Sequence, residues 1–311
     1  MTRPAVHWRC GAAFASLAIA MSVVSAPARA QTAQNASPMS DTTRPHPRLT
    51  EARPAGTRAT LPMGELFVSR AALDARRASM PLIVHFHGAS WLIEQHVARS
   101  APHAALVTIN LGAGSARYAA PFADPAAFAQ LLEHAADETS RALGRPVTWS
   151  RVVLTSFSAG YGAVRAALAQ SGGYARVDAI VLLDSLHASY VLDGDVRAAR
   201  TKDPDVKIAD IDVFTRFAAD AAAGRKRFVV THSEVYPGTY ASTTETANAL
   251  LASLALTRRP VLKQGPLGMQ QLSEAQRGDF RVFGFAGNSA PDHVDHLYAL
   301  GDWLRSWKLL R

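Results

Sequence analysis

Short apolar runs alternate with longer amphipathic stretches along most of this chain. Runs rich in Val, Ile, Leu and Phe predict buried strands at 64–68, 81–86, 105–110, 152–155, 177–183, 227–231 and 280–285. Apolar residues spaced three or four apart predict helices at 124–143, 210–223, 243–256 and 292–310. Because strands and helices alternate, we expect an α/β fold with a mostly parallel, twisted sheet and helices on both faces.

The first sixty residues lack this alternation. Residues 1–30 combine a basic start, an apolar core and an Ala28-Arg29-Ala30 ending, which is typical of a cleaved secretory signal peptide. The apolar part is too short for a membrane span. Residues 31–60 are rich in Pro, Ser, Thr and Arg and predict a flexible leader. We therefore expect one α/β domain over residues 61–311, periplasmic or secreted, without a stable membrane anchor after signal removal.

Cysteine use and charge exclude several kinds of site. Cys10 is the only cysteine and lies inside the predicted signal peptide, so the mature chain would have no disulfide, thiolate nucleophile or cysteine metal site. The chain has 33 basic and 25 acidic residues, a formal net charge of +8, but its basic residues are scattered. Only Arg225-Lys226-Arg227 forms a tight cluster, and no run interleaves bases with aromatics, so we expect no nucleic-acid partner.

The stretch from Val152 to Leu168 carries the strongest chemical signal. A predicted strand passes through Ser156-Phe157-Ser158-Ala159-Gly160 into an Ala-rich segment of good helix propensity. Such a corner lifts the Ser158 side chain above the sheet edge, and the helix N-terminus presents free N–H groups to developing negative charge. Ser158 is therefore a candidate nucleophile, and the alternative is an ordinary helix N-cap.

This stretch resembles the nucleophile elbow, G-x-S-x-G, of the α/β-hydrolase superfamily, with Ser158 at the nucleophile position. One departure is that Ser156 stands where the pattern has its first glycine. The resemblance extends over roughly residues 64–311, because a serine, an acid and a histidine each follow a predicted strand, in the superfamily's order along the chain. It implies the α/β-hydrolase fold and a serine hydrolase, most simply a carboxylic ester hydrolase, that needs no cofactor.

The resemblance also indicates the partners of the serine. His293 follows the last strand, where the superfamily has its histidine, and His296 is the alternative base one helical turn later. Asp184 ends the strand after the elbow helix, an acid position that a minority of the superfamily uses. The commoner position, after the following strand, falls at Glu234. We favour Asp184 as the acid, and Glu234 stays open as the alternative.

Two backbone N–H groups are expected to bind the oxyanion. The residue after the nucleophile, Ala159, supplies one of them. His87-Gly88-Ala89 resembles the superfamily's oxyanion loop, and Gly88 permits close backbone approach. We take Gly88 as the second candidate, although Ala89 stays open. The substrate would be a small-molecule ester, or an amide, cleaved through a Ser158 acyl-enzyme.

Other functions are compatible with parts of this pattern. A metal-dependent hydrolase would use the His85/His87 and His293/His296 clusters, since zinc favours imidazole and carboxylate ligands. Nothing about metal binding requires a serine elbow, so we expect no metal. An acyltransferase on the same fold would differ only in using an alcohol instead of water. A non-catalytic binding protein would have lost the nucleophile or the base.

Overall fold

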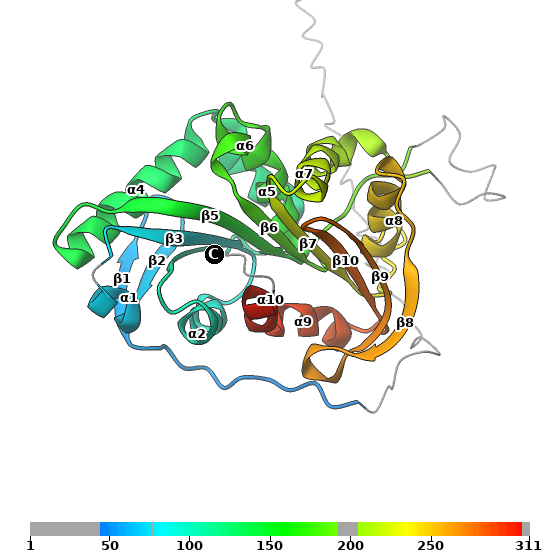
Figure 1. The fold of residues 1–311 in the computed structure, drawn as a ribbon, viewed down its shortest axis with the longest axis horizontal. Coiled ribbons are helices and arrows are strands. Elements are labelled where there is room, and N and C mark those ends of the chain that lie inside the picture. The colour runs from blue at the N-terminus through cyan, green and yellow to red at the C-terminus, as the bar shows by residue number, and fades with distance from the viewer. Residues whose placement is uncertain (1–43, 76, 192–204, 307–311) are drawn as a thin grey trace, which may run out of the picture. The chain divides into compact units, whose positions relative to one another are not determined.

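One twisted sheet organises the part of the chain that the computed structural model describes, residues 44–75, 77–191 and 205–306 (Figure 1). The sheet has ten strands in the order β1-β2-β4-β3-β5-β6-β7-β10-β9-β8. Their bounds are β1 (Gly56–Thr60), β2 (Glu65–Ser69), β3 (Ser79–Phe86), β4 (Ala105–Ile109), β5 (Thr148–Phe157), β6 (Ala179–Leu183), β7 (Arg227–His232), β8 (Arg259–Gln264), β9 (Gln270–Arg277) and β10 (Phe280–Phe285). The predicted signal peptide, residues 1–30, lies outside the described residues.

The centre of the sheet is parallel and its margins are antiparallel. The neighbours β4, β3, β5, β6, β7 and β10 pair in parallel. Strands β1 and β2 add an antiparallel margin next to β4, and β9 and β8 add another next to β10. The central strands are buried on both faces and so have continuous apolar sequences; every residue of β6 is fully buried. The structure therefore confirms the predicted α/β class.

Helices cover both faces of this sheet (Figure 1). They are α1 (Arg70–Ala75), α2 (Ser90–Ser100), α3 (Ser115–Ala119), α4 (Ala127–Leu143), α5 (Tyr161–Ala169), α6 (Gly173–Arg176), α7 (Asp212–Ala222), α8 (Thr243–Ser253), α9 (Ala290–Tyr298) and α10 (Leu300–Ser306), with short 3-10 turns at Ala120–Ala123, Ser158–Gly160, Ile208–Ile211 and Pro266–Gly268.

Two apolar clusters form the core, one on each face of the sheet. Phe128 of α4, Val164 of α5 and Phe217 of α7 belong to the first cluster. Leu92 of α2 and Trp303 of α10 belong to the second. Alternate residues of the central strands feed the two clusters, because side chains along a strand point to opposite faces. Among the described residues, no helix is both long and apolar enough to cross a membrane.

Residues 44–60, which we assigned to a flexible leader, belong to the folded domain. Residues 56–60 form β1, which pairs antiparallel with β2 along its whole length. The preceding residues bind α9 and α2 through arginine side chains. The sequence prediction was wrong here because an edge strand is largely exposed and needs no apolar periodicity; β1 has no fully buried residue.

A second difference lies between residues 259 and 277, where the sequence pattern predicts no strand. This segment forms the antiparallel pair β8 and β9 at the other margin of the sheet. All but one residue of β8 are exposed, so its sequence carries little apolar signal. Within the described residues, the predicted closing helix, 292–310, corresponds to α9 and α10, which are separated at Ala299, and residues 307–310 lie outside the described residues.

Candidate active site

The carboxyl ends of the parallel strands bring the predicted chemical residues to one edge of the sheet. His87 follows β3, Ser158 follows β5, Asp184 follows β6, and His293 lies on α9 after β10. This is the edge at which ligands bind in open α/β sheets. Three of these residues, His87, Ser158 and Asp184, have positive φ angles of 73°, 47° and 45°. Non-glycine residues rarely adopt such angles, and when they do they cluster at functional sites.

The predicted elbow is formed at Ser158. β5 ends at Phe157, and a 3-10 turn from Ser158 to Gly160 leads directly into α5. Gly160 is required by packing, because a Cβ there would lie only 2.3 Å from the carbonyl oxygen of Phe86 on β3. The Ser158 side chain is partly exposed, and within the described residues its hydroxyl has no hydrogen-bond partner. It is thus accessible to a base and to a substrate.

The structure explains the serine in place of the first motif glycine. Ser156 is fully buried, and its hydroxyl lies 2.8 Å from the hydroxyl of Ser185. Ser185 in turn donates to the carbonyl oxygen of Ser158 over 2.7 Å. Because a hydroxyl has one proton, Ser156 must be the donor to Ser185. The backbone of Ser156 has no positive φ angle, so this position does not demand glycine. Ser156 therefore stabilises the elbow through its hydrogen bond to Ser185.

His293 and Asp184 are hydrogen-bonded to each other. The distance from His293 Nδ1 to Asp184 Oδ2 is 2.6 Å. The His293 ring also contacts the ring of Phe157, the residue before Ser158, with ring centroids 4.4 Å apart. A carboxylate can only accept, so Nδ1 carries the proton and Nε2 of a neutral ring is left free to accept one. The arrangement is that of a general base with an orienting acid.

Asp184 accepts hydrogen bonds from other residues besides His293. Its Oδ1 accepts from the Ser233 backbone N–H at 3.0 Å and from the Thr243 hydroxyl at 2.5 Å, and its Oδ2 accepts from the Ser233 hydroxyl at 2.5 Å. Burial by itself disfavours the charged carboxyl, but the His293 ring and the Ser233 hydroxyl hold the pKa of Asp184 well below its ordinary value. The carboxyl is therefore ionised and fixed in one orientation.

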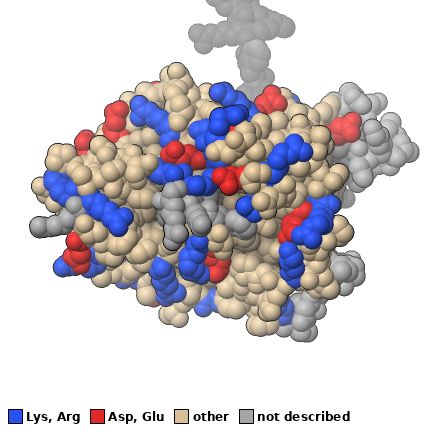
Figure 2. Space-filling model, in the orientation of Figure 1, with Lys and Arg blue, Asp and Glu red and all other residues tan. Residues whose placement is uncertain are grey.

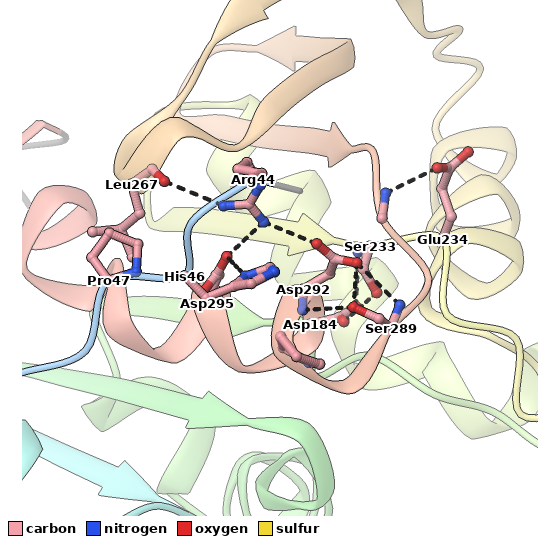
Figure 3. A network of polar contacts seen from close by, with 12 residues as sticks. Arg44, His46, Pro47, Asp184, Ser233, Glu234, Leu267, Ser289, Asp292 and Asp295 are labelled. Atoms are coloured by element: carbon pink, nitrogen blue, oxygen red, sulfur yellow. Dashed lines mark hydrogen bonds and ion pairs between the residues drawn. The ribbon is translucent and has the colours of Figure 1, made fainter. Parts of the chain in front are cut away.

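The alternative acid and base are placed elsewhere. Glu234 exchanges two hydrogen bonds with Gly287. Its backbone N–H donates to the Gly287 carbonyl at 2.8 Å. Its Oε2 accepts from the Gly287 N–H at 3.0 Å, the contact drawn at Glu234 in Figure 3. These two hydrogen bonds stabilise the loop after β10. His296 is buried, with Nδ1 2.7 Å from the Thr231 hydroxyl, and burial lowers its pKa. The geometry thus joins His293 to Asp184 and leaves Glu234 and His296 outside this pair.

The candidate oxyanion loop lies against the elbow. Gly88 has a φ of 140°, which favours glycine, and the ring of His87 stacks on that of Phe157 with centroids 5.7 Å apart. The His87 N–H donates to Ile109 and so is not available to a substrate. Ala159 is the second residue of its helical turn, and the N–H groups at a helix start have no intrahelical partner. Both predicted donors, Ala159 and Gly88, therefore belong to segments that meet at Phe157.

Several residues around this site carried no sequence signal. Tyr118 donates to Asn110 at 3.1 Å and lies 2.7 Å from His87 Nδ1, so it fixes the His87 ring. Burial and the nearby His293 lower the pKa of His87. His187 lies between two tyrosines, with ring centroids 5.5 Å from Tyr161 and 5.1 Å from Tyr240. Single residues in loops or on short helices such as α3 give no periodic pattern, so only the folded arrangement identifies them.

The two histidine clusters considered as metal ligands do not converge. His85 Nδ1 lies 2.7 Å from the Thr155 hydroxyl and its Nε2 lies 2.9 Å from the His87 carbonyl oxygen, so both ring nitrogens have protein partners. His293 binds Asp184, and His296 binds the Thr231 hydroxyl. Across residues 44–75, 77–191 and 205–306, the groups near enough to share an ion are His46, Asp292 and Asp295 instead, and Arg44 already binds both of those carboxylates.

Comparison with known proteins gives low similarities. No protein-family model and no curated protein matches the sequence. Among solved structures, the acylaminoacyl peptidase of Pyrococcus horikoshii is 14% identical with a TM-score of 0.44, over 84% of this chain and 42% of that one. Est1E of Butyrivibrio proteoclasticus is 12% identical with a TM-score of 0.40, over 82% and 98%. The depolymerase LpqC of Bordetella parapertussis, which acts on poly(3-hydroxybutyrate), is 11% identical with a TM-score of 0.41, over 78% and 83%.

The chain spans only part of the first structures that it matches, 33% of the histone deacetylase Clr3 and 42% of the acylaminoacyl peptidase. The identities and TM-scores are low, so the assignment of the fold rests on the features described above. These are the parallel centre of the sheet, the elbow between β5 and α5, and the order of serine, acid and histidine along the chain. With these features, the chain has the α/β-hydrolase fold.

Proposed function

We propose that this protein is a serine hydrolase that cleaves an ester through an acyl-enzyme on Ser158. The observation that carries the proposal is the 2.6 Å hydrogen bond between His293 and Asp184, next to an elbow that holds Ser158 at a φ of 47°. A serine hydroxyl is a weak nucleophile until an oriented base takes its proton. The base, its orienting carboxylate and the nucleophile all come from the same edge of the sheet.

In the first half of the reaction, Nε2 of His293 takes the proton of the Ser158 hydroxyl while its oxygen attacks the substrate carbonyl carbon. The carbonyl oxygen becomes an oxyanion, which the N–H groups of Ala159 and Gly88 bind. When the carbon–oxygen bond to the leaving group breaks, His293 gives its proton to the departing alkoxide. The acyl group is then bound to Ser158, and the free alcohol leaves.

In the second half, His293 takes a proton from water, and the resulting hydroxide attacks the acyl carbon. The same two N–H groups bind the new oxyanion. Its collapse breaks the bond to Ser158, which recovers its proton from His293. Asp184 keeps His293 in the tautomer with a free Nε2 and stabilises the imidazolium that forms in both halves. No cofactor is needed in this sequence.

We favour an ester over an amide because an ester carbonyl is more electrophilic than a resonance-stabilised amide, and an amide nitrogen must be protonated before it can leave. An acyltransferase would follow the same first half, with an alcohol in place of water in the second. Adding a short alcohol and analysing the products separates these outcomes, because transfer yields a new ester and hydrolysis yields the free acid. Turnover is expected to survive a chelator, and its loss would instead favour a metal-dependent hydrolase.

The direct test is labelling by a fluorophosphonate together with turnover of a short-chain aryl ester. Ser158→Ala is expected to abolish labelling and to reduce turnover by at least about a thousandfold, because the nucleophile is gone. Ser253→Ala is a matched control, since Ser253 is exposed on α8 and its hydroxyl binds only the Ala249 carbonyl. Peptide mass spectrometry should find the label on Ser158. A label elsewhere, or turnover retained by Ser158→Ala, would contradict the assignment.

We also propose that residues 1–30 direct export and that the enzyme acts on a small-molecule ester outside the cytoplasm, without a nucleic-acid partner. The proposal is supported by the basic start, apolar core and Ala28-Arg29-Ala30 ending. On the face shown in Figure 2, lysines and arginines are interspersed with acidic residues instead of forming one patch. N-terminal sequencing of the exported protein should find Gln31 as the first residue. A soluble protein that still begins at Met1 would contradict the proposal that residues 1–30 are a cleaved export signal.

A further inference from the structure

The segment ahead of β1 lies along the face of the domain that carries α9 and α2 (Figure 1). We call residues 44–53 the strap. Its first part binds α9 through Arg44, His46 and Arg48. Its last part binds α2: the Gln95 side chain donates to two strap carbonyls, and Arg53 pairs with Glu94 at 3.0 Å. α9 carries His293, so the strap lies against the helix that presents the proposed base.

Arg44 bridges two carboxylates of α9. Its Nη2 donates to Asp292 Oδ1 at 2.9 Å and to Asp295 Oδ2 at 2.6 Å, and its Nη1 donates to the Leu267 carbonyl at 3.2 Å (Figure 3). The Arg44 side chain is 11% exposed, so these contacts are shielded from water. Hydrogen bonds between charged groups in such surroundings are short and strong, and the guanidinium fork fixes their directions.

Asp295 is the most enclosed carboxylate of this network, with a side chain that is 0% exposed. Besides Arg44 it accepts from Arg48 at 2.5 Å and contacts His46 Nδ1 at 2.8 Å. A buried carboxylate is stable only when such partners compensate for the loss of water. Arg48 also donates to the Pro291 carbonyl at 3.3 Å and lies over the Tyr298 ring, 4.6 Å from its centroid. The strap therefore contacts both ends of α9.

The two carboxylates bracket His293 in the sequence. Asp292 also accepts from the backbone N–H and the hydroxyl of Ser289, which caps α9, and the His293 N–H donates to the Ser289 carbonyl at 3.1 Å. The first turn of the helix is thus tied to the strap through Asp292. On its other side, His293 reaches Asp184. Apolar packing of Leu297 against the sheet holds α9 down, but packing alone is tolerant of small rotations.

We propose that Arg44 is a positioning residue of the active site: by binding Asp292 and Asp295 it fixes the rotation of α9 and so keeps the His293 ring on Asp184. The proposal rests on the proposed function for the role of His293, but not for the contact between His293 and Asp184. Catalytic geometry must be held within a fraction of an ångström, so a small rotation of α9 is enough to slow proton transfer.

The test compares three variants within the strap. Arg44→Gln removes the charge that bridges the two carboxylates. Arg44→Lys keeps the charge but loses the planar fork. Arg53→Gln is the matched control, because Arg53 is an arginine of the same strap paired with a buried carboxylate, Glu94, on a helix that does not carry His293. Arg58 keeps both oxygens of Glu94 bound when Arg53 is lost.

The first readout is the kinetics of aryl ester turnover. Arg44→Gln is expected to lower kcat about tenfold with KM close to that of the wild type, because the substrate site is intact and the base is displaced. Arg44→Lys should recover part of the loss, and Arg53→Gln should keep the wild-type kcat. Thermal unfolding of all three variants separates these changes from a general loss of stability.

The second readout does not depend on hydrolysis. The proton on His293 Nδ1, in a short hydrogen bond to Asp184, should give a low-field ¹H NMR signal that disappears in Asp184→Asn. We expect this signal to weaken or shift in Arg44→Gln and to stay unchanged in Arg53→Gln. Wild-type kcat and an unchanged signal in a folded Arg44→Gln variant would overturn the proposal, as would equal kinetic losses in Arg44→Gln and Arg53→Gln.

Failure of the proposed function gives a different result. Wild-type protein would then show no label on Ser158 and no ester turnover, yet the low-field signal would still report whether Arg44 positions His293. A signal that responds to Arg44→Gln and not to Arg53→Gln supports the strap even in that case.

Discussion

The nucleophile and the base of the candidate site are positioned by different physical means. Ser158 is held by the backbone, because the last six residues of β5 are buried, Gly160 packs against the Phe86 carbonyl, and the elbow closes within a few residues of the serine. His293 is held by polar side chains from distant parts of the chain. Its direct partner is Asp184, and its helix is bound by Arg44. The serine side thus depends mainly on backbone packing, with hydrogen bonds from Ser156 and Ser185, and the histidine side depends on buried charge.

This difference has consequences for stability. A backbone turn is fixed by steric contacts, and most substitutions at such a turn disturb them. The positive φ angle of Ser158 costs about 1–3 kcal/mol, which the surrounding packing must offset. A buried carboxylate is stable only with all its donors in place, so Asp184 and Asp295 each depend on several residues. Substitutions that disturb the packing of the elbow should therefore affect folding first, and those on the histidine side should affect catalysis first.

The largest effect is expected on the histidine side. Asp184→Asn should lower kcat by about a thousandfold or more, because an amide N–H facing His293 Nδ1 favours the tautomer that leaves Nε2 protonated. Glu234→Gln is the control, since Glu234 contacts Gly287 and not His293. Both variants would be compared by ester turnover and by the rate of fluorophosphonate labelling. A larger loss in Glu234→Gln than in Asp184→Asn would reverse the assignment of the acid.

On the serine side, Gly160→Ala should lower the free energy of unfolding by about 3 kcal/mol, because its Cβ would overlap the Phe86 carbonyl at 2.3 Å. Gly172→Ala is a matched substitution with nothing within 4 Å of the new Cβ, although its φ of 75° is unfavourable for alanine. We expect it to cost about 1 kcal/mol. Urea unfolding measures both values, and equal losses would show that the elbow is not tightly packed against β3.

A smaller effect is expected for Thr243→Val, which removes one donor to Asp184 while keeping the side-chain shape. Two hydrogen bonds from Ser233 remain, so we expect kcat to fall about tenfold. Thr246→Val is the matched control on the same helix, because the Thr246 hydroxyl is also fully buried but donates to the Ser242 carbonyl. Similar stability losses with a kinetic loss in Thr243→Val alone would support the polar anchoring of the acid.

The last prediction concerns pH, with one buried histidine on each side of the site. His85 contacts the His87 carbonyl and His232 contacts the Ser233 carbonyl, and burial lowers the pKa of each to about 3. The unfolded chain binds protons at these histidines below about pH 6.5, whereas the folded chain does so only near pH 3. Stability should therefore fall as pH falls through this window.

Each histidine should contribute up to about 1.4 kcal/mol per pH unit to this loss. Urea unfolding between pH 7 and pH 5 measures the slope. His232→Gln should flatten it, whereas His134→Gln, an exposed position on α4, should not. Equal stability at pH 7 and pH 5 would show that these histidines are not buried in the neutral form.

The sequence by itself was sufficient for the features that depend on local patterns. Continuous apolar runs predict strands buried on both faces, and their alternation with amphipathic stretches predicts the parallel sheet. The elbow at Ser158 could be found because strand, small-residue corner and helix follow each other within one short segment. His293 could be found because it follows the last strand.

Tertiary structure alone decided which residues meet across the chain. Asp184 and Glu234 both follow strands, and only the fold shows that His293 reaches Asp184 while Glu234 binds Gly287. Ser156, which departs from the motif, acquires its partner Ser185 only after β5 and β6 have paired.

The margins of the sheet and the strap also could not be predicted from sequence patterns. β1 and β8 are largely exposed, so their residues need no apolar periodicity. The sequence of the strap is typical of a polar leader, because the carboxylates that its arginines bind, Asp292, Asp295 and Glu94, are far away in the sequence. Periodicity records which residues are buried, whereas the partner of a buried charge is set by long-range contacts that form only in the folded chain.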